Sequence, residues 1–317
     1  MDNRSKVFLH KVETVKGTDA VPTSTDDLVV LNGDVNISIA TEQDSGEGEL
    51  KGTWGPGESV TVKQSQSFPV STRVRGLGQG ASALLVPHIH GGMMASAHSV
   101  TTSGDGSATP RAAEYKPTSV EADLKSATGY FYEAGLLYTM LGAVNDLKLE
   151  ASMSALVASY NVQAKYTDPT VVALPSFNMP TEEVFRMTSA LCSVSEGGST
   201  VNIGAFTFDT GVTVEEDYET GNHDFELSNR NPTITIDPKA VATAADWNAL
   251  RDATSLAIIV TFTNSIGETL VFTAPNAVPM ENARGVRAGR ITSAKTYSLK
   301  EGVAGDDQYT IKWTSVL

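Results

Sequence analysis

Apolar and polar residues alternate in successive short runs along residues 201–238. The apolar positions come in pairs two residues apart: Phe206 and Phe208, Val212 and Val214, Phe225 and Leu227, and Ile234 and Ile236. A period of two is the pattern of a strand that buries one face. The stretch therefore predicts a ladder of antiparallel strands, with one face in the core and the other toward solvent or a partner.

Carboxylates gather between these apolar positions, and no Lys or Arg interrupts them before Arg230. They are Glu215, Glu216, Asp217, Glu219, Asp224 and Glu226. Because a sheet that buries its apolar face turns its polar face outward, we expect a strongly acidic exposed surface here. A second acidic group lies in an earlier region of strand pattern and comprises Glu42, Asp44, Glu47 and Glu49.

The first half of the chain has less regular parts. Residues 1–27 contain no long periodic stretch, so we expect an N-terminal arm that a contact orders or, alternatively, a solvated tail. Residues 81–88 suit a short helix. The polar stretch about 98–127, rich in Ser, Thr, Gly and Pro, predicts a long surface loop.

The second half repeats the order of parts seen in the first: an acidic strand pair, a hairpin, a short helix and a meander of strands. Its helix is predicted over 244–253, where Thr243 and Asp246 match a capping box and Trp247, Leu250 and Ala253 share one helical face. We interpret the order as an internal repeat, with chance similarity of two β-rich halves as the alternative.

The repeat predicts a division into two modules. The expected parts are an N-terminal arm (1–27), a first module (28–166), a proline-spaced linker (167–183) and a second module (184–317). A ring of three such chains would present six modules, whereas a single-module chain would need six copies.

Composition excludes several classes of protein. The 317 residues carry a formal net charge of -14, which argues against a sequence-independent grip on DNA or RNA. The single cysteine, Cys192, excludes an intramolecular disulfide. No apolar run approaches about 18 residues and no N-terminal leader is present, so we expect a soluble protein that folds in a reducing cytoplasm.

Candidate chemistry is weak. His88, His90 and His98 lie close in sequence, but no Cys, Asp or Glu nearby completes a metal site, so satisfied or surface histidines are favoured. The glycines of residues 76–80 follow a strand pattern without the third spaced glycine of a nucleotide-binding turn, which favours a simple turn. No GxSxG motif frames a nucleophile, and Cys192 has apolar neighbours. We therefore expect no catalytic residue, no cofactor and no metal.

Three stretches carry a resemblance to a known family. They are VRGLGQGASALLVPHIHGG, LVASYNVQAKYTDPTVVALP at the junction of the halves, and FTFDTGVTVEEDYETGNHDFELSNRNPTITIDP followed by a helix. The chain resembles the tail tube protein (major tail protein) of long-tailed bacteriophages over most of residues 28–317. The resemblance implies a mainly β fold of two tandem tube modules, each a β-sandwich or half-open barrel flanked by a short α-helix.

The resemblance also implies a function that lies in surfaces. It points to a structural virion protein, made and assembled in the host cytoplasm, whose rings stack into a hollow tail tube through which DNA passes. The implied partners are the chain itself in homotrimeric or, alternatively, homohexameric rings, other tail proteins at the tube ends, and a tape measure protein and DNA in the lumen without specific binding. It implies no membrane.

The charged residues gain candidate roles from this resemblance. Carboxylates lining a lumen repel DNA phosphates over about 8 Å at physiological salt, so both acidic groups are candidates to face it. The register of the strands decides which of these carboxylates face the lumen. The alternative is that the acidic surface serves only solubility. Basic residues are candidates for contacts between rings, with ordinary solvated loops as the alternative: Lys6, Lys11, Lys16, Arg284, Arg287 and Arg290.

Two other functions compete with this one. A β-sandwich binding module, such as an adhesin or a receptor- or carbohydrate-binding tail component, predicts aromatic residues clustered in a groove. Trp54, Trp247 and Trp313 are instead far apart in the sequence. A β-rich hydrolase predicts a convergent acid or nucleophile site, which the sequence lacks.

Overall fold

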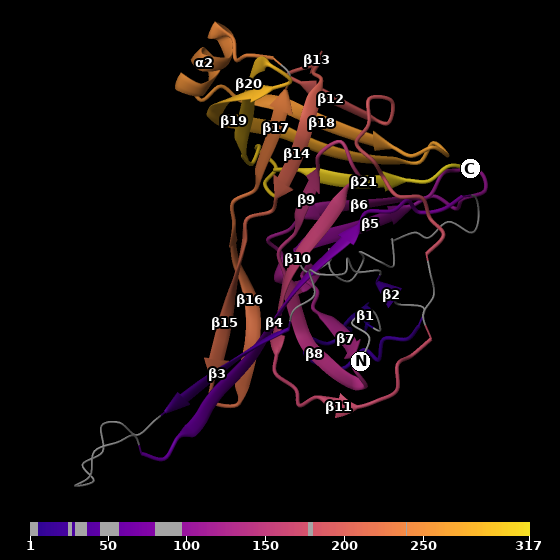
Figure 1. The fold of residues 1–317 in the computed structure, drawn as a ribbon, viewed down its shortest axis with the longest axis vertical. Coiled ribbons are helices and arrows are strands. Elements are labelled where there is room, and N and C mark those ends of the chain that lie inside the picture. Colours follow the sequence, from indigo (N-terminus) through magenta and orange to yellow (C-terminus); the bar gives the residue numbers. More distant parts are fainter. Residues whose placement is uncertain are drawn as a thin grey trace.

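The chain is mainly β, as predicted (Figure 1). The structure, a computed structural model, describes residues 6–24, 27–28, 37–44, 57–79, 97–176, 180–238 and 240–317. Within these residues the one α-helix is α2 (Ala244–Arg251). The helix predicted over 81–88 lies outside the described residues, as do Glu47, Glu49, Trp54, His88 and His90.

Strands account for most of the described chain. The first half contains β1 (Lys6–Val12), β2 (Asp27–Leu28), β3 (Ser38–Asp44), β4 (Val60–Arg73), β5 (His98–Ser103), β6 (Ala112–Pro117), the 3-10 helix η2 (Glu121–Asp123), β7 (Ala127–Glu133), β8 (Leu136–Asn145), β9 (Lys148–Ala151), β10 (Val157–Lys165) and β11 (Thr170–Val171). The second half contains β12 (Cys192–Glu196), β13 (Ser199–Thr200), β14 (Ile203–Asp209), β15 (Val212–Glu219), β16 (Asn222–Arg230), β17 (Thr233–Pro238), α2, β18 (Leu256–Thr263), β19 (Thr269–Arg287), β20 (Arg290–Leu299) and β21 (Thr310–Thr314).

The predicted ladder over 201–238 is confirmed as β14 to β17, but it divides into two parts. β14 pairs with β17, and the alternating Phe206, Phe208, Ile234 and Ile236 are at most 1% exposed. β15 and β16 pair only with each other and form a separate two-stranded sheet. The inner pair therefore belongs to the core, whereas the acidic pair is a hairpin that projects from it (Figure 1).

The two halves of the chain are joined by strand pairing. β14 continues onto β9 of the first half, and β21 near the C-terminus pairs with β6. A single hydrophobic cluster draws on both halves, and Tyr115 meets Trp313 edge to face at 5.4 Å between ring centroids. The division into two modules stays a prediction, and any such modules share core and sheet.

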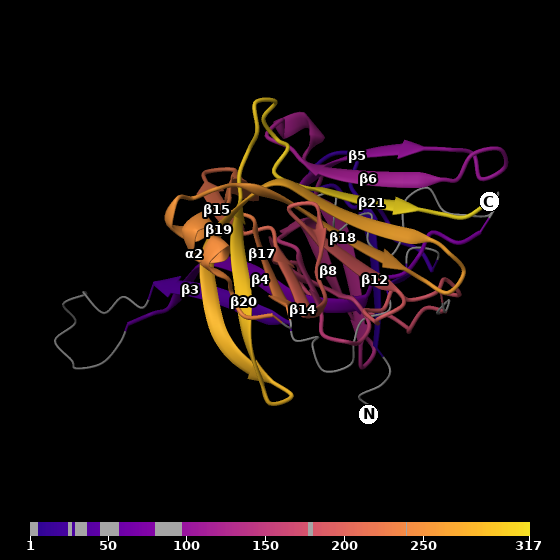
Figure 2. The ribbon, with the colours of Figure 1, turned by 90° about the horizontal axis from the view of Figure 1, so that it is seen from above.

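The long loop predicted at about 98–127 is wrong. β5 and β6 form a hairpin there, and Figure 2 shows it beside β21 at one edge of the molecule. The composition misled because β5 is an edge strand whose residues 100–103 are exposed, so its polar side chains resemble a loop. Asp105 holds the connecting turn by accepting the N–H groups of Ser107, Ala108 and Thr109, which lowers its pKa to about 2.

The N-terminal segment is part of the body and not an arm over residues 6–24. β1 pairs with β7 along its whole length, and Val7, Phe8 and Leu9 are at most 5% exposed. After β1, the buried Glu13 carboxylate accepts hydrogen bonds from the backbone of residues 17 and 142 and from the hydroxyls of residues 126 and 128. The sequence pattern did not predict β1, because the centre of this strand is buried on both faces and its apolar and polar residues therefore do not alternate.

The capping box of α2 is confirmed. The Asp246 amide donates to Thr243 Oγ1, and the Thr243 amide donates to Asp246 Oδ2 at 2.6 Å. The predicted apolar face is wrong, because Trp247 is 51% exposed and residue 253 lies beyond the helix end. The helix is tied to the sheet through Asp246, which receives Lys295 of β20 at 2.7 Å.

Candidate functional site

The hairpin of β15 and β16 arranges its carboxylates by register. Glu215 lies opposite Glu226 and Asp217 opposite Asp224, whereas Glu216 lies opposite the buried Phe225. Residues directly opposite on antiparallel strands share a face. One face therefore carries Glu215, Asp217, Glu219, Asp224 and Glu226, and Glu216 alone is turned to the other face, which corrects the expectation of one common surface.

Like charges directly opposite destabilise a hairpin, and Lys165 offsets part of this repulsion, whereas Lys63 pairs with Glu216 on the other face. Lys165 of β10 lies 2.7 Å from Asp224, and Lys63 of β4 lies 2.7 Å from Glu216. Burial opposes the charge on Glu216, but hydrogen bonds from Lys63 and His223 outweigh it and keep its pKa below the usual value. The lysines thereby fix the hairpin against the body.

Glu42 and Asp44, the described members of the second acidic group, lie on a hairpin next to the first group. β3 pairs with β4, and this hairpin lies beside β15 and β16 (Figure 1). The Tyr218 hydroxyl donates to the Val62 carbonyl at 2.7 Å, and Lys63 spans the same junction. We call the two hairpins together the acidic arm. Its exposed carboxylates include Glu42, Asp44, Glu215, Glu219 and Glu226.

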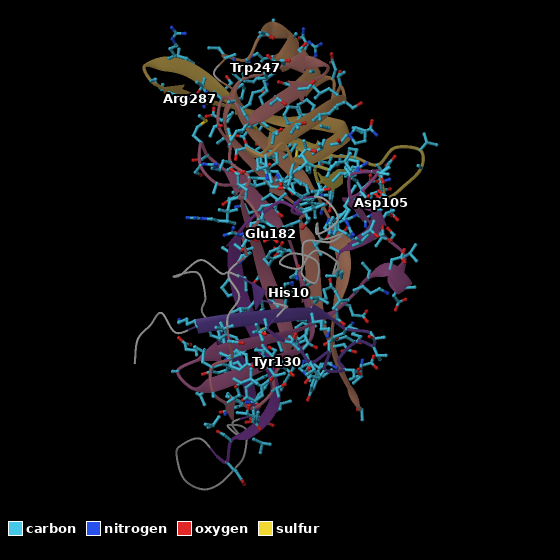
Figure 3. All side chains as sticks on the ribbon, turned by 90° about the vertical axis from the view of Figure 1, so that its right-hand side faces the viewer. His10, Asp105, Tyr130, Glu182, Trp247 and Arg287 are labelled. Atoms are coloured by element: carbon cyan, nitrogen blue, oxygen red, sulfur yellow. The ribbon has the colours of Figure 1, made fainter. Side chains whose placement is uncertain are left out.

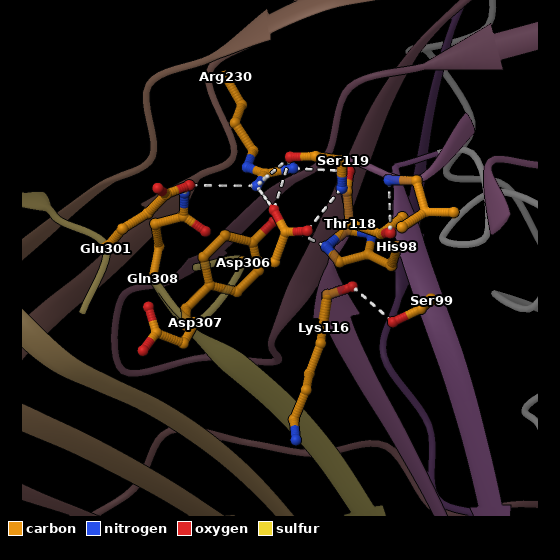
Figure 4. A network of polar contacts seen from close by, with 12 residues as sticks. His98, Ser99, Lys116, Thr118, Ser119, Arg230, Glu301, Asp306, Asp307 and Gln308 are labelled. Carbon is orange, nitrogen blue, oxygen red and sulfur yellow. Dashed lines mark hydrogen bonds and ion pairs between the residues drawn. The ribbon is translucent and has the colours of Figure 1, made fainter. Parts of the chain in front are cut away.

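The root of the acidic arm is held by Arg230, the last residue of β16 (Figure 4). Its guanidinium donates to the Thr118 carbonyl at 2.7 Å, to Ser119 Oγ at 3.2 Å and to the Asp306 carboxylate. Ser119 in turn donates through its amide and hydroxyl to Asp306. Sequence reasoning missed this cluster, which we call the Arg230 clamp, because its members lie far apart along the chain.

Loss of the clamp should loosen the arm. Arg230→Ala removes the charged hydrogen bonds and leaves Asp306 without its cation, so we expect unfolding to become easier by about 2 kcal/mol. Urea unfolding measures this loss, and hydrogen exchange at β16 should rise. Arg186→Ala is the matched control, because its ion pair with Glu183 is half exposed and should contribute less than about 1 kcal/mol. Equal losses in the two variants would contradict the clamp.

The predicted basic residues divide into two sets. Lys6 pairs with Glu133 at 2.7 Å, Arg287 with Asp237 at 2.8 Å, and Lys16 approaches Glu226 at 3.7 Å. The other three, Lys11, Arg284 and Arg290, are exposed, and within the described ranges no ion pair is seen for them. The first set is paired within the chain, and for the second set a role in contacts between rings stays a prediction.

The residues considered for catalysis or metal binding that lie within the described ranges, His98, Gly78 and Cys192, have structural surroundings. His98 is buried and hydrogen-bonded to the Tyr309 hydroxyl at 2.8 Å. The Gly78 amide donates to the buried Glu268 carboxylate, so a side chain of the protein occupies that turn. Burial raises the pKa of Cys192 to about 11, which keeps the thiol protonated. Across the described residues, no group of His, Cys, Asp or Glu is placed to hold a metal.

Aromatic residues do not form an exposed groove in the described part of the chain. Trp313 is buried, whereas the half-exposed Trp247 and Tyr218 lie on α2 and β15, at different ends of the molecule (Figure 1). No helix among the described residues is both long and apolar enough to cross a membrane.

The chain thus presents exposed charged hairpins on a mainly β scaffold, which fits a structural protein that acts through its surfaces. A sequence model of the family described as phage tail tube protein matches residues 4–307, nearly the whole chain. The chain belongs to this family, and the predicted resemblance is confirmed. The family is structural and not enzymatic, so the chain is a component of the virion tail. A comparison with individual curated proteins gave no significant match.

Proposed function

We propose that copies of this chain form rings that stack into the hollow tail tube, and that the acidic arm lines a lumen through which DNA passes. The observation that carries the proposal is the carboxylate face of the hairpin, where Glu215 opposes Glu226 and Asp217 opposes Asp224. Charge kept for solubility can be scattered at little cost, whereas opposed carboxylates reduce stability. Their placement opposite each other favours a role that needs concentrated negative charge.

Repulsion of phosphate explains that role. DNA that passes through a tube must not bind its wall, and carboxylates act on phosphates within about 8 Å at physiological salt. The exposed members of the face, Glu215, Glu219 and Glu226, are best placed to repel phosphates, because Asp224 is already paired with Lys165. DNA and a tape measure protein would occupy such a lumen without specific binding.

The proposed ring contains three chains, each contributing two modules, and a homohexamer is the alternative. The mass of one ring distinguishes them. Other tail proteins would close the tube ends, and synthesis and assembly would take place in the host cytoplasm.

Neutralising the face tests the lumen. Tubes assembled from the variant E215Q/D217N/E226Q are expected to retain short duplex DNA at low salt, whereas wild-type tubes exclude it. The control E121Q/D123N/E281Q makes the same charge change at exposed positions outside the acidic arm and should behave as wild type. Sedimentation of tubes with labelled DNA gives the readout. Equal retention by the two variants would contradict an acidic lumen at this face.

A further inference from the structure

The hairpin of β19 and β20 ends in an exposed tip with an unusual composition. Val286 and Ile291 lie directly opposite each other and are 74% and 40% exposed. The exposed Arg284 lies on the same face as this pair, the exposed Arg290 lies at the turn opposite Arg287, and residues 282–291 contain no acidic side chain. An exposed aliphatic pair at a tip that also carries arginines is typical of a surface that docks on a partner, because burial of the pair supplies affinity and the arginines supply specificity.

The tip is held in a fixed direction by its third arginine. Arg287 pairs with Asp237 of β17 at 2.8 Å and also donates to its backbone carbonyl. Gly204 makes room for it, since a Cβ at this position would lie 1.4 Å from Arg287 Nη1. Arg287 therefore orients the hairpin, and Arg284 and Arg290 remain for a partner.

The end of the acidic arm has the complementary composition. Val60, Val62 and Tyr218 are 58%, 48% and 49% exposed where the two hairpins of the arm meet. Glu42 and Glu58 are exposed on the same hairpin; Lys63 lies opposite Glu42, but its ammonium is paired with Glu216 at 2.7 Å. Apolar side chains bordered by carboxylates match apolar side chains bordered by guanidinium groups in both hydrophobicity and charge.

The two surfaces lie at opposite ends of the molecule. In Figure 1 the hairpin of β19 and β20 lies with α2 at the upper end of the long axis, and the acidic arm reaches the lower end. Figure 3 shows Arg287 and Trp247 at the same upper end from the side. One chain cannot bring its own tip onto its own arm, but a second copy displaced along the long axis can.

We propose that the β19–β20 tip of one copy docks on the end of the acidic arm of the next copy, with Val286 and Ile291 against Val60, Val62 and Tyr218. This inference rests on the proposed tube, and it identifies the contact between successive rings. The contact joins two different surfaces and does not close on itself, so it repeats along an axis and generates a filament. The carboxylates at the arm's end thus bind the next ring, whereas those on the face of β15 and β16 serve the lumen.

Charge reversal tests the pairing. R284E/R290E is expected to lose tubes at concentrations where the wild type polymerises, while single rings persist in electron micrographs. E42R/E58R should show the same loss, and the chain that carries all four changes should regain tubes because both surfaces are reversed together. The matched control R186E/R251E alters exposed arginines elsewhere and should polymerise as wild type.

The outcomes separate this inference from the proposed function. If the wild type forms tubes and R284E/R290E polymerises equally well, the docking contact is wrong but the tube stands. The same holds if the variant with all four charge reversals does not regain tubes. Wild-type protein without rings or tubes would overturn the tube itself. A cross-link provides a second measurement that needs no charge reversal. The variant V62C/V286C in a C192S background should form ladders of disulfide-linked chains when tubes are oxidised. If only monomers are seen after oxidation, the contact is wrong.

Discussion

A chain that lacks residues 1–20 is expected to lose its fold, and not merely its ability to assemble. The deletion removes β1 from its pairing with β7, together with the buried Val7, Phe8 and Leu9. It also removes Glu13, which leaves the groups that it binds around residues 126–142 without their acceptor. Circular dichroism and urea unfolding should show a chain without a cooperative transition, or one with a much lower midpoint.

Point variants keep this prediction testable if the shortened chain is insoluble. Phe8 is fully buried and stacks on Phe68 with 5.3 Å between centroids, so Phe8→Ala should cost about 3–5 kcal/mol. Val15 is 64% exposed, and Val15→Ala should change stability by less than about 0.5 kcal/mol. A shortened chain that unfolds at the wild-type midpoint would restore the interpretation of an arm.

Replacement of Lys295 is expected to give the second large loss. Its ammonium lies 2.8 Å from Glu196 and 2.7 Å from Asp246, and its side chain is 10% exposed. Burial opposes its charge, but the hydrogen bonds to Asp246 and Glu196 outweigh this effect and raise its pKa. Lys295→Ala leaves two carboxylates in a largely dry site, which typically costs about 3–5 kcal/mol. Urea unfolding should also show α2 released from the sheet.

A surface pair provides the control for Lys295. Lys148 and Glu150 are 2.6 Å apart, but their side chains are 43% and 46% exposed. Lys148→Ala should therefore cost less than about 1 kcal/mol. If both lysine variants lost the same small amount, Lys295 would not stabilise the junction of α2, β12 and β20.

Sequence reasoning succeeded where one face of a strand is buried and the other is solvated. The rungs Phe206, Phe208, Ile234 and Ile236 could be predicted because their alternation follows directly from such a sheet. It failed for β1, which is buried on both faces, and for β5, whose edge position leaves it polar. In both cases the period depends on which strands lie alongside, and a local pattern does not contain that information.

The candidate site shows the same limit. The carboxylates of the acidic arm could be predicted from the sequence, because they cluster along the chain. That Glu42 and Asp44 on β3 lie near β15 could not be predicted. Their lysine partners could not be predicted, because Lys63 and Lys165 are distant in sequence from Glu216 and Asp224. The Arg230 clamp was missed for the same reason, since it joins the end of β16 to two loops that only the fold brings together.

The proposed assembly is a tube with the carboxylate face of β15 and β16 inside. Cryo-electron microscopy of tubes assembled from the purified protein tests it most directly, because one map gives the ring, its subunit number and the lining of the lumen. We expect a hollow stack of rings with Glu215, Asp217 and Glu226 facing the lumen. A tube whose lumen is lined by another surface, with the acidic arm on the outside, would contradict it.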